Sequence, residues 1–357
     1  MTGLLSEIPD ADKLLRQEEE RERALDDARQ LRRNARTMAD LKAENRNLHK
    51  AVDVLEEHLA VRQALAEAIA KPPIVKLKKR EQRDAIIPIA VNTDEHYDET
   101  FTLEETGGLN EQNPEIAEAK VETYIERLIR LIEREALDNP VPLLVMPFLG
   151  DMITGELHAK SERLSPMTPL EASRFAYRLK RQIIDSLLAT DLPRILIPCV
   201  DGNHGRTTAK RTPGLNARYS HETDVYLRLA DHYEEAGEKR VQFYIPQTDF
   251  ASLEIAPGFR LCITHGDSVR GGGGIGGIAP SLLRAASRWR EAYPADLYLL
   301  GHHHQYWDLG SIAMSASAVG YDPYAASMGL SPTPPSQLFT TLNAGRLTRG
   351  TTAPIWL

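Results

Sequence analysis

Residues 296–304 read DLYLLGHHH, a short run of mostly apolar residues followed at once by a glycine and three histidines. Four to eight apolar residues between polar boundaries are typical of a buried strand. Three consecutive imidazoles have no role in an apolar core, whereas open α/β sheets place their ligand sites beyond the carboxyl ends of strands. The stretch therefore predicts a buried strand that ends in a metal-binding loop.

The same arrangement occurs four more times upstream. The apolar runs that precede a polar motif cover 86–91, 141–148, 194–200 and 260–264. The motifs that follow them are, in order, Asp94-Glu95-His96, Gly150-Asp151, Gly202-Asn203-His204 and His265-Gly266-Asp267. Each motif is weak alone, since Gly-Asp is ordinary turn chemistry. Their joint position after apolar runs is not expected of scattered polar residues and predicts a single site.

Helical stretches separate these runs, at 114–135, 170–189 and 223–236, and a sixth apolar run covers 241–245. Strands that alternate with helices predict an α/β fold. We expect this fold over 86–320. The remaining segment, 321–357, is rich in Pro, Ser and Thr and predicts an irregular C-terminal tail.

The first 70 residues differ in character from the rest. Residues 11–70 contain neither Pro nor Gly and are rich in Ala, Leu, Glu and Arg, which predicts one long helix. A heptad seam runs along it, with one position occupied by Met38, Asn45, Val52 and Leu59 and the other by Leu41, Leu48 and Leu55. A buried Asn among leucines is typical of parallel two-stranded coiled coils. We expect a coiled-coil arm over 1–70 that makes a homodimer; the alternative is a helix that packs on its own domain. A basic linker over 71–85 follows.

Composition limits the class of protein. The 357 residues carry 43 Lys and Arg against 51 Asp and Glu, a net charge of −8, which argues against a broad basic surface but not against a local one. Cys199 and Cys262 lie in apolar runs and predict buried free thiols in a reducing compartment. The sequence has no stretch of about 18 apolar residues, so we expect a cytoplasmic protein without a membrane span.

The five motifs, in this order, resemble those of the calcineurin-like metallophosphoesterase superfamily over about residues 86–310. The resemblance implies a four-layer α-β-β-α sandwich with two metal ions at the strand ends. It implies that the first ion is held by Asp94, His96, Asp151 and His304. It implies that Asp151 bridges to the second ion, whose other ligands are Asn203, His265 and His302. His204 matches the family's catalytic histidine, which is not a ligand.

The sequence departs from the family at two places. The family usually has an acidic residue directly after Asn-His, which orients the catalytic histidine, where this chain has Gly205. It usually has a further Asp or Arg after Gly-Asp, where this chain has Met-Ile-Thr-Gly at 152–155. Asp201 or Asp267 could replace the missing acid. The first departure puts the rate in question rather than metal binding.

The motif residues fit the hydrolysis of phosphoester bonds by a metal-activated water. Two divalent ions about 3.5–4 Å apart stabilise both the attacking and the leaving oxygen. His204 could protonate the leaving oxygen, and Arg206 could bind phosphate through two hydrogen bonds. Mixed Asp, Asn and His ligands suit manganese, iron or zinc better than calcium, and we expect manganese.

The substrate is less well defined by the sequence. Residues 206–218 include four cations and no acid, so Lys210, Arg211 and Arg218 could follow a nucleic-acid backbone. A solvated loop explains the same residues. We expect a DNA nuclease similar to phage-type, repair-exonuclease-like members of the superfamily. A phosphatase or phosphodiesterase for proteins or small molecules is the second hypothesis, and a catalytically weak coiled-coil adaptor is the third.

Overall fold

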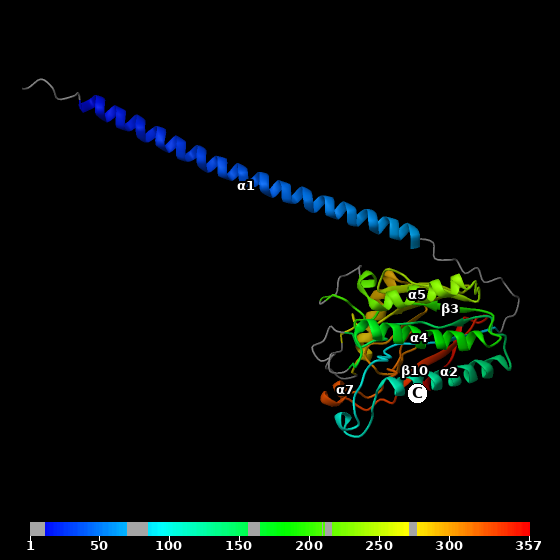
Figure 1. Cartoon of the computed structure of the whole chain (residues 1–357). Helices are drawn as coiled ribbons and strands as arrows, with labels where there is room; N and C mark the ends of the chain where they lie inside the picture. Colours follow the sequence, from blue (N-terminus) through cyan, green and yellow to red (C-terminus); the bar gives the residue numbers. More distant parts are fainter. Residues whose placement is uncertain (1–10, 70–84, 156–164, 209, 211–215, 271–276) are drawn as a thin grey trace, which may run out of the picture. The chain divides into compact units, whose positions relative to one another are not determined.

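The computed structural model describes residues 11–69, 85–155, 165–208, 210, 216–270 and 277–357 (Figure 1). The chain divides into two compact units, Met1–Ile74 and Val75–Leu357. The predicted linker over 71–85 lies outside the described residues, apart from Ala85. None of the helices within the described ranges combines the length and the apolar character that crossing a membrane requires.

The described residues of the first unit form one helix, α1 (Ala11–Ile69), drawn in blue in Figure 1. Its 59 residues make it about 88 Å long at 1.5 Å per residue. Met38, Leu41, Leu48 and Val52 of the predicted seam are each about half exposed. The side chains of Leu55 and Leu59 lie outside the described residues. The pairing of two copies through this seam stays a prediction.

The second unit is built on two sheets. The first sheet has the strand order β11-β10-β1-β2-β3-β4. Its strands are β1 (Ile86–Ala90), β2 (Leu144–Val145), β3 (Ile195–Pro198), β4 (Val241–Tyr244), β10 (Ser336–Asn343) and β11 (Thr348–Trp356). β1 to β4 are parallel to one another, and β10 runs antiparallel to both β1 and β11. The parallel strands therefore end at one edge, where their polar motifs begin.

The second sheet has the order β5-β6-β7-β9-β8. Its strands are β5 (Phe250–Ala256), β6 (Phe259–Thr264), β7 (Leu297–Leu300), β8 (Trp307–Asp308) and β9 (Ile312–Met314). β6, β7 and β9 are parallel, and β5 and β8 close the two edges as antiparallel partners. Arg349 of β11 reaches Asp308 of β8 with N–O distances of 2.9 and 3.0 Å, which ties the two sheets together.

Three of the longer helices start at capping residues that the sequence supplies. α2 (Pro114–Ala136) begins after Asn113, whose side chain accepts from the backbone N–H of Ile116. α4 (Pro169–Leu188) begins after Thr168 with a capping box, and α5 (His221–Glu235) begins after Ser220. The other helices are α6 (Ala279–Ala292), the short α7 (Pro323–Ser327) and the 3-10 turns η1 (Glu104–Thr106) and η2 (Asn216–Tyr219). Such caps satisfy backbone N–H groups that have no partner inside the helix.

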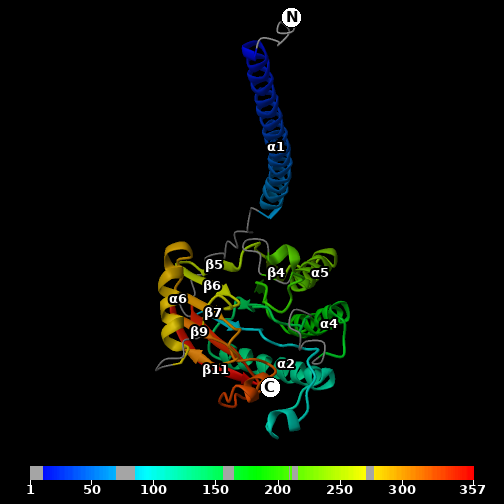
Figure 2. The same cartoon turned by 90° about the vertical axis from the view of Figure 1, so that its left-hand side faces the viewer.

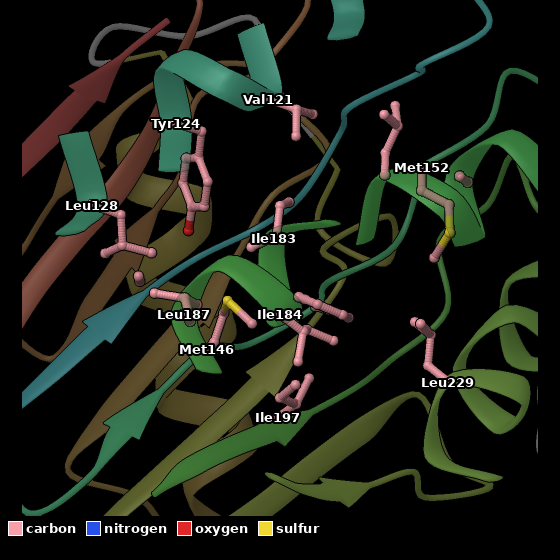
Figure 3. Packing of buried hydrophobic residues seen from close by; sticks show 14 of the residues in the cluster. Val121, Tyr124, Leu128, Met146, Met152, Ile183, Ile184, Leu187, Ile197 and Leu229 are labelled. Atoms are coloured by element: carbon pink, nitrogen blue, oxygen red, sulfur yellow. The ribbon is translucent and has the colours of Figure 1, made fainter. Parts of the chain in front are cut away.

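Three hydrophobic clusters form the core of the second unit among its described residues. One cluster packs the first sheet against α2, α4 and α5, with contributions from Leu128 of α2 and Ile184 of α4 (Figure 3). Another joins the two sheets, and the third packs the second sheet against α6. Leu144 lies in the first cluster and Val145 in the second, because successive side chains of a strand point to opposite faces. Figure 2 shows α6 on the other side of the strands from α4 and α5.

Each of the six predicted runs contains a strand, and the three predicted helices are present, so the predicted α/β fold is confirmed. Cys199 and Cys262 are free and buried, as predicted. The prediction of an irregular tail over 321–357 is wrong, because α7, β10 and β11 lie there. β10 was not recognised because its polar side chains are buried. Gln337, for example, bonds to both backbone groups of Thr93 at 2.9 Å.

Candidate metal centre

Both sheets contribute to one site at the carboxyl ends of their parallel strands. Asp94 and His96 follow β1, Asp151 follows β2, and Asn203 follows β3. The second sheet contributes His265 after β6 and both His302 and His304 after β7. Asp94, His96, Asp151 and His265 are buried, whereas the other three are partly exposed. The inner part of the site is thus buried, and its outer part is partly exposed to solvent.

Strained backbone marks the same residues. Six non-glycine residues have positive φ within the described ranges, and five of them are predicted ligands: Asp94, His96, Asp151, His302 and His304. Their φ angles lie between 38° and 69°. Such conformations cost of order 1–3 kcal/mol each and persist where the surrounding structure enforces them, which is common at functional sites.

Glycines allow the ligand loops to approach one another. A Cβ on Gly202 would overlap Oδ1 of Asp151, and a Cβ on Gly301 would overlap Oδ2 of Asp94. A Cβ on Gly150 would overlap the backbone of Gly202. The glycine in three of the motifs is therefore required by the space that the carboxylates and the neighbouring loop occupy.

His265 is at the centre of one group of ligand-type atoms. Its Nδ1 lies 2.7 Å from the carbonyl oxygen of Leu149, which can only accept a hydrogen bond, so Nδ1 carries a proton. Its Nε2 lies 3.0 Å from Oδ2 of Asp151 and 3.0 Å from Oδ1 of Asn203. Either a proton on Nε2 or a metal ion would satisfy these three electron-rich atoms. Burial lowers the pKa of His265, but the charge of Asp151 outweighs burial and raises it to about 10.

His302 completes this group, because its ring nitrogen lies within 4.8 Å of the ligand atoms of Asp151 and His265. Burial and the nearby His265 lower the pKa of His302 to about 3, so its ring is neutral near pH 7. A neutral imidazole is the form that binds a metal. The residues of this group therefore fit a divalent cation.

Asp94, His96 and His304 form the other group, again with ligand atoms within 4.8 Å of one another. Nδ1 of His96 is buried and has no hydrogen-bond partner in the structure. A buried nitrogen without a partner costs about 1–3 kcal/mol, and a metal ion would satisfy it. Burial and the neighbouring His204 lower the pKa of His96 to about 3, which keeps the ring available as a ligand.

Asp151 lies between the two groups. Its carboxylate is within 4.8 Å of ring nitrogens of His96 and His204, and it also belongs to the group with His265 and His302. Its Oδ1 accepts from the backbone N–H of His204 at 2.8 Å. Burial raises its pKa, but the attraction of His265 and His204 outweighs burial and holds the pKa well below the usual value. This is the position that a bridging carboxylate requires.

His204 is held by its ring as well as by its backbone. Its Nδ1 lies 2.8 Å from the carbonyl oxygen of Thr154, in the loop after Asp151. The backbone N–H of Thr154 in turn donates to the buried Asp98 at 2.8 Å. The segment 152–155, which departs from the family pattern, therefore supplies the acceptor that orients His204.

The predicted substrate-binding cations are only partly described. The backbone of Arg206 forms a single antiparallel β-bridge with that of Ser220. The buried Nε of Arg206 has no hydrogen-bond partner in the structure. Lys210 and Arg218 are exposed, and Arg211 lies outside the described residues. Among the described residues, no contact joins Lys210 or Arg218 to the candidate metal-binding groups.

Several buried residues stabilise the loops of this site. The motifs at the strand ends did not indicate them. Lys180 of α4 forms an ion pair with Glu95, and both side chains are at most 4% exposed. Glu95 lies between Asp94 and His96 in the sequence, so its ion pair with Lys180 anchors the loop after β1 to α4. Burial lowers the pKa of Lys180 and raises that of Glu95, against the mutual attraction of the two charges. Nζ of Lys180 also lies 4.1 Å from the ring centre of Phe148.

Asp322 supports the last loop. Its Oδ1 caps α7, and its Oδ2 lies 3.6 Å from Nδ1 of His304, whose Nε2 lies 3.5 Å from Asp94. An imidazole between a carboxylate and a metal position is a common arrangement, because the carboxylate orients the ring. Glu222 of α5 is also fully buried, and it accepts from the backbone N–H groups of Met152 and Gly202 at 2.7 Å each.

Comparisons with known proteins give only distant similarity. No family model and no curated protein matches the sequence. Two solved structures of Vacuolar Protein Sorting 29 are similar to the chain. The one from Cryptosporidium parvum is 12% identical with a TM-score of 0.32, covering 77% of this chain and 100% of that one. The one from Entamoeba histolytica, a single mutant, is 13% identical with a TM-score of 0.28, covering 75% and 98%. A dimetal phosphatase from Danio rerio is 12% identical with a TM-score of 0.34, covering 76% and 100%. At this level of similarity the function has to be derived from the side chains of the site.

Proposed function

We propose that the second unit is a two-metal phosphoesterase with the four-layer sandwich of the calcineurin-like metallophosphoesterases. The observation that carries the proposal is the position of Asp151 between two groups of ligand-type side chains. The helices packed on the outer face of each sheet support the four-layer arrangement. The order of the five motifs along the chain supports the family.

Seven side chains would hold the ions. We assign Asp94, His96, Asp151 and His304 to the first ion and Asp151, Asn203, His265 and His302 to the second. Two bound divalent ions would neutralise the charge of the phosphate and lower the pKa of a water so that it can attack. The mixture of oxygen and imidazole ligands favours manganese, with iron and zinc as alternatives.

His204 and Arg206 would act on the substrate directly. Because Thr154 accepts from Nδ1 of His204, Nε2 is the nitrogen through which this ring would exchange a proton with the leaving oxygen. The guanidinium of Arg206 can donate two parallel hydrogen bonds to a phosphate. Its unpaired Nε is consistent with a group that acquires a partner when substrate binds.

For the substrate we propose a phosphodiester of DNA, supported by the basic segment 206–218. A phosphatase for protein or small-molecule monoesters fits the metal-binding groups equally well. An inactive adaptor is the third hypothesis. The complete ligand set argues against it.

The test uses full-length protein stripped of metal and reloaded with Mn²⁺. Its substrates are single-stranded DNA, duplex DNA, bis(p-nitrophenyl) phosphate and p-nitrophenyl phosphate. A DNA nuclease should cleave DNA and the small diester, a phosphatase should prefer the monoester, and chelation should stop both reactions. Binding of two Mn²⁺ ions without hydrolysis of any substrate would favour the adaptor instead.

Two variants separate binding from turnover. Asp151→Asn should lose hydrolysis almost completely together with bound metal, because a bridging ligand serves both ions. His204→Ala should keep both ions and lose roughly 10²- to 10⁴-fold in kcat, the usual contribution of a general acid. His303→Ala is the matched control, since this histidine of the same loop bonds to the carbonyl of Val269 and belongs to neither group. Loss of a metal from the His204 variant would refute the role assigned to that residue.

A further inference from the structure

The side chain of Glu222, from another part of the sequence, occupies the space next to position 205. Gly205 stands where the family usually has an acid, and it is buried. A Cβ there would overlap Cγ of Glu222 and lie 2.7 Å from its Cδ and 3.0 Å from its Oε2. The φ of Gly205 is not in the left-handed region, so its backbone conformation does not itself require glycine. The three atoms nearest to the added Cβ all belong to Glu222, so the side chain of Glu222 is what excludes a side chain at position 205.

Glu222 connects the two loops on either side of the bridging carboxylate. Its Oε1 accepts from the N–H of Met152, the residue after Asp151. Its Oε2 accepts from the N–H of Gly202, the residue before Asn203. One carboxyl group thus fixes the separation between the loop that follows β2 and the loop that follows β3.

The start of α5 is itself tied to the same loops, so Glu222 is held rigidly. The hydroxyl of Ser220 accepts from the N–H of Glu222 at 3.1 Å, and the N–H of His221 donates to the carbonyl of Gly205 at 2.8 Å. Asp201, which the sequence suggested as a substitute acid, accepts from the hydroxyl of Thr223 instead. Glu222 is the acid that occupies the space beside position 205.

We propose that Glu222 is a positioning residue that replaces the acid missing after Asn203-His204. It acts through backbone N–H groups: it holds the loop whose Thr154 carbonyl orients His204, and it holds the loop that carries Asn203. Gly205 and Glu222 form one unit, in which the absence of a side chain at one position makes room for the carboxyl group of the other. The proposal rests on the two-metal function proposed above.

A double-mutant cycle on the full-length protein tests this unit. Gly205→Ala and Glu222→Ala should each weaken Mn²⁺ binding roughly 10- to 100-fold, the usual effect of removing a residue that orients metal ligands. The combined variant should bind Mn²⁺ no more weakly than Glu222→Ala alone, because alanine at 222 has no Cγ for the new methyl group to meet. Additive losses would overturn the coupling between the two positions.

Glu222→Gln tests the carboxyl group at constant size. Both oxygens of a carboxyl group can accept hydrogen bonds, whereas an amide has one acceptor and would turn its NH₂ toward one of the two N–H groups. We expect weaker Mn²⁺ binding and lower kcat for the small diester with little change in KM. Asp224→Asn is the matched control, since Asp224 lies in the same helical turn but is exposed and pairs with Arg228.

Three measurements decide between the outcomes. They are Mn²⁺ titration of metal-free protein, kcat with the small diester, and denaturant unfolding of the metal-free protein. A Gln variant that unfolds more easily but binds Mn²⁺ as the wild type does would make Glu222 a structural residue only and overturn the proposal. A wild-type protein that binds none of Mn²⁺, Fe²⁺ and Zn²⁺ would instead overturn the two-metal function on which it rests.

Discussion

Replacement of Lys180 by methionine should destabilise the second unit severely. The substitution keeps the length of the side chain but removes the cation that pairs with Glu95 in the buried layer behind the first ligand loop. Removing one partner of a buried ion pair leaves an uncompensated charge and costs about 3–5 kcal/mol. Lys180 is 1% exposed, so water cannot take its place without opening the core.

This loss should be visible as a fall in the unfolding midpoint. A loss of 3–5 kcal/mol corresponds to a decrease on the order of 10 °C in Tm for a domain of this size. The three tryptophans, at 289, 307 and 356, all lie in the second unit, so their fluorescence reports its unfolding without a signal from α1. The measurement is made with a chelator present, so that bound metal does not contribute.

The control for this prediction removes both charges. Glu95→Gln in the Lys180→Met background should recover part of the stability, because it removes the uncompensated buried charge that the single variant leaves. Lys239→Met, at an exposed site, should change stability by less than about 0.5 kcal/mol. The reasoning is refuted if Lys180→Met loses less than about 1 kcal/mol, or if the double variant is no more stable than the single one.

Three further predictions concern the substrate, the contact between the sheets and the assembly. Replacing Lys210, Arg211 and Arg218 by Ala should weaken DNA binding and flatten its salt dependence while cleavage of a small diester changes little; equal losses on both substrates would weaken the nuclease hypothesis. Arg349→Met should cost about 1 kcal/mol near pH 7, because the bond to the carboxylate of β8 is partly exposed. That bond holds the pKa of Asp308 below its ordinary value of 3.8, although burial opposes it, so the folded form binds protons less readily than the unfolded form. The stabilisation is therefore present above pH 3.8 and disappears as pH falls through the lower folded-state pKa, and urea titrations of both proteins should converge in acid. Deleting residues 1–70 should convert a dimer into a soluble monomer that keeps activity on small diesters, whereas a full-length monomer in light scattering at micromolar concentration would exclude the coiled coil.

The positions of the candidate metal-binding residues could be predicted because they follow apolar runs directly. A proposed ligand such as Asp151 or His302 comes at the point where a parallel strand ends, and the local order of residues then places it in space. β10 could not be predicted in this way, since the polar side chain of Gln337 is buried by hydrogen bonds to a distant segment rather than by apolar contacts. Local periodicity contains no information on such partners.

The supporting residues were missed for a related reason. Glu222 reads as an ordinary acid in the first turn of a helix, where acids are common. Its role depends on the approach of α5 to Gly205, which is a property of the packed fold. A glycine in the sequence does not indicate which side chain occupies the space beside it, so the pairing of Gly205 with Glu222 is visible only in the folded structure.

The hydrogen bonds between Gln337 and Thr93 can form only late in the synthesis of the chain. The loop of the first ligand is held through both backbone groups of Thr93 by a side chain 244 residues later in the chain. At the usual ribosomal speed of 5–20 residues per second, roughly 10–50 s pass between the synthesis of the two segments. During that interval β1 lacks its neighbour β10, and an unpaired strand edge can join a strand of another nascent chain. We expect expression to benefit from chaperones that bind nascent chains, and fragments that stop before β10 to aggregate although they contain every metal-binding residue.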